Sequence, residues 1–118
     1  ANAMYLPKVI KYNSKNSEAA SRYADIAKFI GLNGNSTEEL VDALIAEIRK
    51  MNRSIDIPTC IKDYEGGIID EKEFNSKLKD VAALAIADAC TGSNPRQPSQ
   101  EEMEKLLTAV YYDREIDF

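Results

Sequence analysis

The residues best suited to chemistry in this chain lie in the segment Cys90 to Arg96, which reads Cys-Thr-Gly-Ser-Asn-Pro-Arg between two helical patterns. A connector between helices requires only a stop, a turn and a cap, so this string holds more functional groups than a connector needs. Cys90 is the only plausible nucleophile, and its thiol would need a base or an electropositive setting to ionise near neutral pH. Thr91, Asn94 and Arg96 could donate hydrogen bonds to a ligand.

The absence of histidine limits what this segment can do alone. The chain has no His and two cysteines, Cys60 and Cys90. It therefore lacks the usual general base and the commonest transition-metal ligand, and two Cys without His rarely form a closed zinc site. The residues by themselves favour a structural interpretation, in which Cys90 is a small apolar residue at a helix end. Thr91 and Asn94 would then satisfy unpaired backbone groups.

An acidic stretch offers a second candidate site. It contains Asp63, Glu65, Asp70, Glu71 and Glu73. A calcium loop needs ligands at alternating positions, a central glycine and a closing glutamate, and this spacing is missing. We interpret the stretch as a solvated face.

Composition indicates one ordinary globular domain spanning residues 1–118. The chain is 44% hydrophobic and 30% charged, with a net charge of −5. Its Lys and Arg are interleaved with Asp and Glu, which argues against a nucleic-acid partner. No apolar run approaches the ~20 residues that cross a bilayer, and no segment resembles a secretion signal. Two cysteines make no disulfide framework, so we expect reduced thiols in a cytoplasmic protein.

Apolar periodicity predicts an all-α domain of about five helices in one bundle. No segment alternates with a period of two for long enough to be a strand. A short first helix is expected around Pro7 to Tyr12, either with Pro7 in its first turn, where Pro is tolerated, or as the tail of a longer helix. The others are expected at residues 17–30, 37–53, 71–90 and 100–112.

Caps and turns set these boundaries. The pairs Ser36 with Glu39, Asp70 with Glu73, and Ser99 with Glu102 predict three capping boxes. Gly31 is expected to end the second helix in a left-handed conformation, and Gly66-Gly67 predicts a turn.

Apolar side chains are expected to fix how the elements pack. The stripe of the third helix should run from Leu40 to Met51. Pro58 excludes a helix in the following stretch, where Ile55, Ile57 and Ile61 should anchor the loop.

Three stretches together resemble the C-terminal helical domain of the iron-dependent (group III) alcohol dehydrogenases. The first, Ala1 to Asn13, reads Ala-Asn-Ala-Met-Tyr-Leu-Pro-Lys-Val-Ile-Lys-Tyr-Asn and is similar to the family segment that follows a metal-binding His-Gly pair. The second is Ile57-Pro58 with Ile61, Lys62 and Asp63. The third is Cys90 to Arg96 followed by a capped helix. The resemblance covers almost the whole chain.

The resemblance implies the C-terminal part of a dehydroquinate synthase-like helical domain. In that family an N-terminal α/β domain binds NAD(P), and the helical domain holds a divalent metal, Fe²⁺ or Zn²⁺, on one Asp and three His. No residue of this chain matches a metal or nucleotide ligand, so the resemblance places those groups upstream. It also places six residues in the substrate-side wall of the interdomain cleft: Cys90, Thr91, Gly92, Asn94, Pro95 and Arg96.

The resemblance further implies a fragment of a longer NAD(P)-dependent alcohol dehydrogenase that is inactive alone. Its partners would be the upstream metal- and nucleotide-binding parts of the same protein and, after self-association, other copies of the chain. The longer protein could be a stand-alone enzyme, which the segment between Asn13 and Arg22 favours, or a bifunctional aldehyde–alcohol dehydrogenase. Ala1-Asn2-Ala3 is interpreted as native sequence instead of a cloning remnant. The alternative function is a non-enzymatic one: the chain would be an independent helical protein-interaction module.

Overall fold

The all-α prediction is confirmed in the computed structural model, which describes residues 2–64 and 69–118. Ala1, Glu65 and the turn expected at Gly66-Gly67 lie outside the described residues. Within that part of the chain there is no strand, and no helix is long and apolar enough to span a membrane. The helices are α1 (Asn2–Asn13), α2 (Ser17–Phe29), α3 (Thr37–Ser54), α4 (Glu71–Ala87) and α5 (Gln100–Tyr112), with 3-10 turns η1 (Ile61–Asp63) and η2 (Thr91–Ser93).

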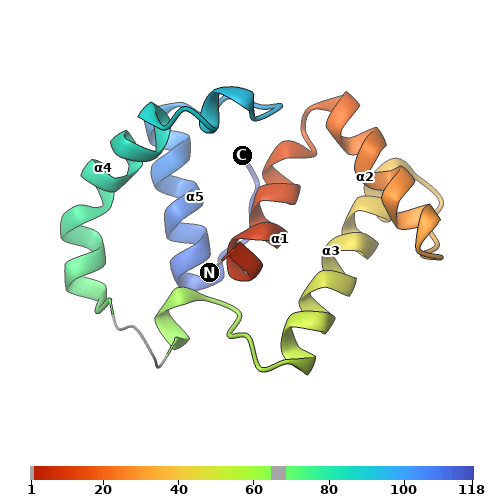
Figure 1. Cartoon of the computed structure of the whole chain (residues 1–118), viewed down its shortest axis with the longest axis horizontal. Coiled ribbons are helices and arrows are strands. Elements are labelled where there is room, and N and C mark those ends of the chain that lie inside the picture. Colours follow the sequence, from red (N-terminus) through yellow and green to blue (C-terminus); the bar gives the residue numbers. More distant parts are fainter. Residues whose placement is uncertain (1, 65–68) are drawn as a thin grey trace.

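Helix α1 lies at the centre of the molecule, between the α2–α3 pair and the α4–α5 pair (Figure 1). One buried side chain of α1 packs toward each of these helix pairs. Ile10 packs with Ala20 and Val41 from α2 and α3. Tyr12 packs with Ala109 of α5 and Ile116 of the C-terminal segment. Because α1 is shared by both halves, it fixes how they sit relative to each other.

The α2–α3 and α4–α5 pairs are held by different kinds of contact. Small residues on α2, including Ala24 and Ala27, let the helix approach Leu40 and Leu44 of α3 closely. On the other side, the ring of Phe74 in α4 stacks on Tyr111 of α5 with centroids 4.1 Å apart. An alanine face permits a short interhelical distance, whereas an aromatic pair adds directional stacking.

Helix α1 begins at Asn2, five residues before Pro7, so the prediction of a first-turn proline is wrong and the alternative, the tail of a longer helix, is confirmed. A proline inside a helix removes the hydrogen bond that its N–H would donate to the carbonyl four residues earlier, here that of Ala3. The side-chain amide of Asn52 in α3 donates to that carbonyl at 2.9 Å. A tertiary contact therefore satisfies the group that Pro7 leaves unpaired, and the helix continues through it.

Replacing Asn52 with alanine is expected to destabilise the domain by about 1–2 kcal/mol, because the Ala3 carbonyl would lose its partner. Urea unfolding followed by circular dichroism measures this. Asn75→Ala is the matched control, since Asn75 is an exposed helical asparagine that donates to Tyr112 at 3.3 Å. Both substitutions gain the same helix propensity, so equal effects would contradict the role assigned to Asn52.

The three predicted caps form, although only one is a complete capping box. Ser99 accepts from the amide of Glu102 at 3.1 Å, and Glu102 accepts from the amide of Ser99 at 3.2 Å. Ser36 and Asp70 also accept from the amides three residues ahead. The carboxylate of Glu39, however, accepts from the amide of Asn35, one residue earlier than expected.

The predicted left-handed end of α2 is confirmed at Gly31, whose φ is +87°. Its amide donates to Lys28 and the amide of Leu32 donates to Ala27, the two bonds of a Schellman motif. A residue with a Cβ would be strained at this φ, which explains the glycine.

Two apolar side chains predicted to be buried are exposed instead. Met51 is 55% exposed and Ile55 is 67% exposed. Helix α3 has 18 residues and its partner α2 has 13. The buried side chains of α3 that pack against α2 are Leu40, Val41 and Leu44, near its start. Met51 and Ile55 lie beyond them, and a periodic stripe alone does not reveal where the contact with a neighbouring helix stops.

Candidate functional site

The segment Cys90 to Arg96 connects α4 to α5, and α4 ends at Ala87, three residues before the predicted Cys90. The carboxylate of Asp88 accepts from the amide of Cys90 at 2.8 Å and so starts the turn η2. The hydroxyl of Thr91 donates to the carbonyl of Ala85 at 2.6 Å. This bond satisfies a carbonyl at the end of α4, as the structural interpretation of Thr91 predicted.

A cavity of about 510 Å³ separates this loop from α1 and α5. Three of the six predicted cleft residues line it, namely Cys90, Thr91 and Asn94, whereas Gly92, Pro95 and Arg96 do not. Helix α1 forms another wall along its length through Asn2, Tyr5, Val9 and Tyr12. Helix α5 supplies the apolar side chains Met103, Leu106, Leu107 and Val110. The cavity therefore combines a mostly apolar lining with a few polar groups, as small-molecule sites usually do.

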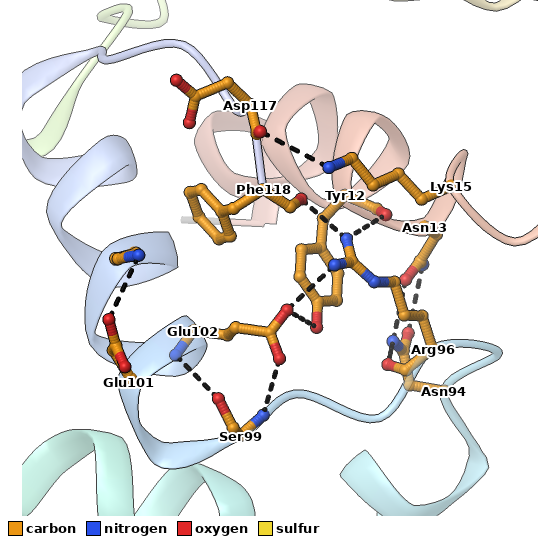
Figure 2. A network of polar contacts seen from close by, with 11 residues as sticks. Tyr12, Asn13, Lys15, Asn94, Arg96, Ser99, Glu101, Glu102, Asp117 and Phe118 are labelled. Atoms are coloured by element: carbon orange, nitrogen blue, oxygen red, sulfur yellow. Dashed lines mark hydrogen bonds and ion pairs between the residues drawn. The ribbon is translucent and has the colours of Figure 1, made fainter.

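The guanidinium of Arg96 contacts α1, α5 and the C-terminal segment (Figure 2). Its guanidinium donates to the carbonyl of Tyr12 at 3.0 Å and to that of Phe118 at 2.8 Å. It also donates to the carboxylate of Glu102 at 2.9 Å and lies 3.8 Å above the centre of the Tyr12 ring. A cation at the last turn of α1 is favourable with the helix dipole. Arg96 thus holds α1, α5 and the C-terminal segment together.

The groups around Arg96 have fixed protonation states near neutral pH. The pKa of Glu102 is lowered, first by the hydrogen bond from the Ser99 backbone, then by Tyr12 and by the charge of Arg96, against a smaller opposing effect of burial. Burial raises the pKa of Tyr12, and the charge of Arg96 only partly offsets this. The phenol therefore donates to the Glu102 carboxylate, at 3.1 Å, and neither group titrates near pH 7.

Asn94 pairs with Asn13, the last residue of α1. The side-chain amide of Asn94 donates to the oxygen of Asn13 at 2.8 Å, and that of Asn13 donates back at 3.1 Å (Figure 2). Asn16, the N-cap of α2, donates to the carbonyl of Pro95 at 3.1 Å. Sequence reasoning missed Asn13 and Tyr12, and found Glu102 only as a capping residue.

The two cysteines differ sharply in accessibility. Cys90 is exposed and Cys60 is buried, with its sulfur 3.3 Å from the carboxylate of Asp63. Burial is the main cause that raises the pKa of the Cys60 thiol. A higher pKa and poor access both lower the concentration of reactive thiolate.

We expect a disulfide reagent such as dithiobis(nitrobenzoate) to label the protein in two phases at pH 8. Cys90 should react at least ~10-fold faster than Cys60, because burial raises the pKa of the Cys60 thiol and limits access to it. The liberated chromophore gives the rates, and Cys90→Ser should remove only the fast phase. Loss of the slow phase in that variant would contradict the assignment.

The described residues do not offer a metal site. Across residues 2–64 and 69–118 no group of three or more His, Cys, Asp or Glu side chains is placed to hold an ion. The chain also has no histidine. Any metal used near the cavity would need ligands that these residues do not supply.

Comparison with known proteins relates the whole chain to one group. The family described as Fe-containing alcohol dehydrogenase family, C-terminal, matches residues 1–111. An NADPH-dependent butanol dehydrogenase of Clostridium saccharobutylicum is 52% identical over 118 residues, which are 100% of this chain and 29% of that protein. An aldehyde-alcohol dehydrogenase of Clostridium acetobutylicum is 39% identical over 90% of this chain and 14% of its own length. An alcohol dehydrogenase of Thermococcus barophilus is 33% identical over 95% of this chain and 27% of its own length.

Proposed function

From the premise that this chain belongs to the Fe-containing alcohol dehydrogenase family and corresponds to its C-terminal domain, we propose that it is part of an NAD(P)-dependent, divalent-metal alcohol dehydrogenase. The chain spans less than a third of the length of the relatives it matches. In this proposal the whole protein interconverts an alcohol and an aldehyde by hydride transfer. This chain contributes scaffold and one wall of the substrate cleft.

One observation carries the proposal for the cleft. Cys90, Thr91 and Asn94, which the family resemblance assigns to the cleft wall, line a single cavity together with one face of α1 that begins at Asn2. The resemblance places the metal-binding segment directly before α1, so the cavity would lie beside it. Apolar side chains of α5 opposite this wall would shield the reacting atoms from water. Gly92, Pro95 and Arg96 would support the wall instead of lining it.

The metal and the nucleotide are assigned to the rest of the protein. The described residues lack a set of side chains that could hold a metal ion. The bound groups would supply activation of the alcohol oxygen and acceptance of the hydride. The residues of this chain would bind the substrate and orient it.

The test compares the full reading frame with this chain alone. The full protein, loaded with Fe²⁺ or Zn²⁺, is expected to form NADH or NADPH from short alcohols, measured by absorbance at ~340 nm, and the 118-residue chain is not. The upstream codons are expected to encode His-rich metal motifs and a nucleotide-binding domain. Turnover by the chain alone would refute its assignment as a wall, and an upstream region without such a domain would refute the proposal.

We favour a stand-alone dehydrogenase over a bifunctional one. Identity is 52% to the butanol dehydrogenase and 39% to the aldehyde-alcohol dehydrogenase. This difference supports the stand-alone type, as the segment between Asn13 and Arg22 suggested. The two free cysteines support a reducing, cytoplasmic compartment.

Self-association of the isolated chain is expected, since apolar side chains remain exposed on two outer helices. Phe29 on α2 is 91% exposed and Leu84 on α4 is 71% exposed. Removing such side chains from water is the driving force for association. Sedimentation velocity should show concentration-dependent oligomers that Phe29→Ser or Leu84→Ser weakens, whereas Thr108→Ser should have no effect. A monomer at all concentrations would contradict this expectation and the proposed homo-oligomer.

A further inference from the structure

We infer that Asn13 is a positioning residue for the substrate cleft: from the last turn of α1 it fixes where the Cys90–Thr91 wall sits. This inference rests on the proposed function of that wall. Asn13 is only 3% exposed, and it was not among the predicted site residues. It does not line the cavity, so any effect on a substrate must pass through the loop.

Hydrogen bonds within the loop define its shape but not its position. The amides of Ser93 and Asn94 donate to carbonyls within the loop. The side-chain amide of Gln97 donates to the carbonyls of Thr91, Gly92 and Asn94 at 2.8–3.2 Å. These bonds define the internal shape of the loop. They do not determine its distance from α1, because none of them reaches another element.

Asn13 attaches the cavity side of the loop to α1 through its reciprocal amide pair with Asn94 (Figure 2). Farther along the loop, Arg96 donates to the carbonyl of Tyr12, and Asn16 donates to that of Pro95. The side-chain nitrogen of Asn13 also donates a second hydrogen bond, to the hydroxyl of Tyr23 at 3.2 Å. The ring of Tyr23 packs against the buried clusters between α1, α2 and α3. Asn13 thereby joins the loop to the core of the other half of the molecule. A buried side chain with three satisfied hydrogen bonds has little freedom to move, so it sets a defined position.

Within the Asn13–Asn94 pair, only the side chain of Asn94 lines the cavity. Asn94 lines the cavity with Cys90 and Thr91, and the same side chain carries the bond to Asn13. A shift of the Asn13–Asn94 pair therefore displaces the wall directly. A misplacement of about 1 Å in a substrate-positioning group is enough to reduce turnover strongly.

The test uses the full-length protein with Asn13→Asp and the matched control Tyr23→Phe. The aspartate keeps the size of the side chain but turns its donor toward Asn94 into an acceptor. Tyr23→Phe removes the other bond of Asn13 and leaves its pair with Asn94 intact. Hydrogen exchange of the peptide spanning residues 88–97, read by mass spectrometry, should accelerate at least ~10-fold in Asn13→Asp, and exchange in residues 40–52 of α3 should stay unchanged. Tyr23→Phe, which removes one of the three bonds of Asn13 and keeps its pair with Asn94, should leave exchange in residues 40–52 unchanged and accelerate exchange at 88–97 far less than Asn13→Asp does.

Steady-state kinetics on the same proteins provides the readout that a merely structural role would not move. Asn13→Asp is expected to raise the KM for the alcohol roughly fivefold or more while kcat falls less. If Asn13→Asp does not fold, Asn94→Ala breaks the same pair from the loop side and should give both effects. Unchanged exchange at 88–97, or accelerated exchange with an unchanged KM, would overturn the inference. A wild-type protein without alcohol oxidation would refute the proposed function, and the exchange result alone would then uphold or overturn the anchoring by Asn13.

Discussion

Replacing Arg96 with alanine is expected to lower the free energy of unfolding by about 3 kcal/mol. The substitution deletes hydrogen bonds to the carbonyls of Tyr12 and Phe118 and leaves the carboxylate of Glu102 without its cation. It also removes the guanidinium stacked 3.8 Å above the Tyr12 ring. All of these contacts lie where α1, α5 and the C-terminal segment meet. The three segments therefore cannot restore the lost contacts by relaxing independently of one another.

Urea unfolding measured by circular dichroism tests this expectation. The matched control is Arg22→Ala, since Arg22 has a 77% exposed side chain whose one ion pair among the residues that the structure describes is with Glu18 on the same helix. Such an exposed pair contributes about 0.5 kcal/mol or less. Arg96→Lys should recover only part of the loss, because an ammonium cannot serve the same three acceptors in one plane. An Arg96→Ala variant as stable as Arg22→Ala would refute the role assigned to Arg96.

The second large effect is expected at Asp113, where asparagine should destabilise the domain by about 2–3 kcal/mol. The carboxylate accepts from the guanidinium of Arg49 in α3 at 2.9–3.1 Å and pairs with the ammonium of Lys8 in α1 at 2.9 Å. The side chain of Lys8 is only 10% exposed, so it would remain buried beside Arg49 without a counter-charge. Asparagine tolerates the φ of +59° at this position, so the change isolates the charge.

Asp42→Asn is the matched control for this prediction. Asp42 pairs with Lys11 at 2.8 Å, but its side chain is 53% exposed. Its removal should cost about 0.5 kcal/mol or less, because water screens an exposed pair. If the two variants proved equally stable in urea, the buried pair would not contribute as argued.

The lowered pKa of Asp113 also predicts how the free energy of unfolding changes at acidic pH. Burial alone would raise its pKa, but the hydrogen bonds from Arg49 and Lys8 and their charges outweigh this, so the pKa lies below its ordinary value of 3.8. The unfolded chain therefore takes up this proton first as the pH falls. The stabilisation is fully present above the unfolded pKa and is lost as the pH falls through the lowered folded pKa. The difference between wild type and Asp113→Asn should accordingly be constant near neutral pH and shrink below about pH 4.

Much of the local structure could be predicted from the sequence because its causes are local. The helices followed from apolar spacing, and the starts of α3, α4 and α5 followed from Ser36, Asp70 and Ser99. Each of these signals involves residues at most four positions apart, where helix geometry already fixes the contacts. The family followed from motif order along the chain, which also requires no tertiary information.

Tertiary structure decided how those elements support a site. Helix α1 continues through Pro7 because Asn52, 49 residues away in sequence from Ala3, satisfies the freed carbonyl. The resemblance assigned Arg96 to the wall of the substrate cleft, and the structure adds that its guanidinium contacts partners that include Tyr12, 84 residues away. The sequence alone thus determined the all-α class, the caps and the family of the chain. Only the packing of α1 against both helix pairs decided which motif residues reach the cavity and which are used to hold it, because hydrogen bonds between distant residues depend on three-dimensional proximity that no local pattern encodes.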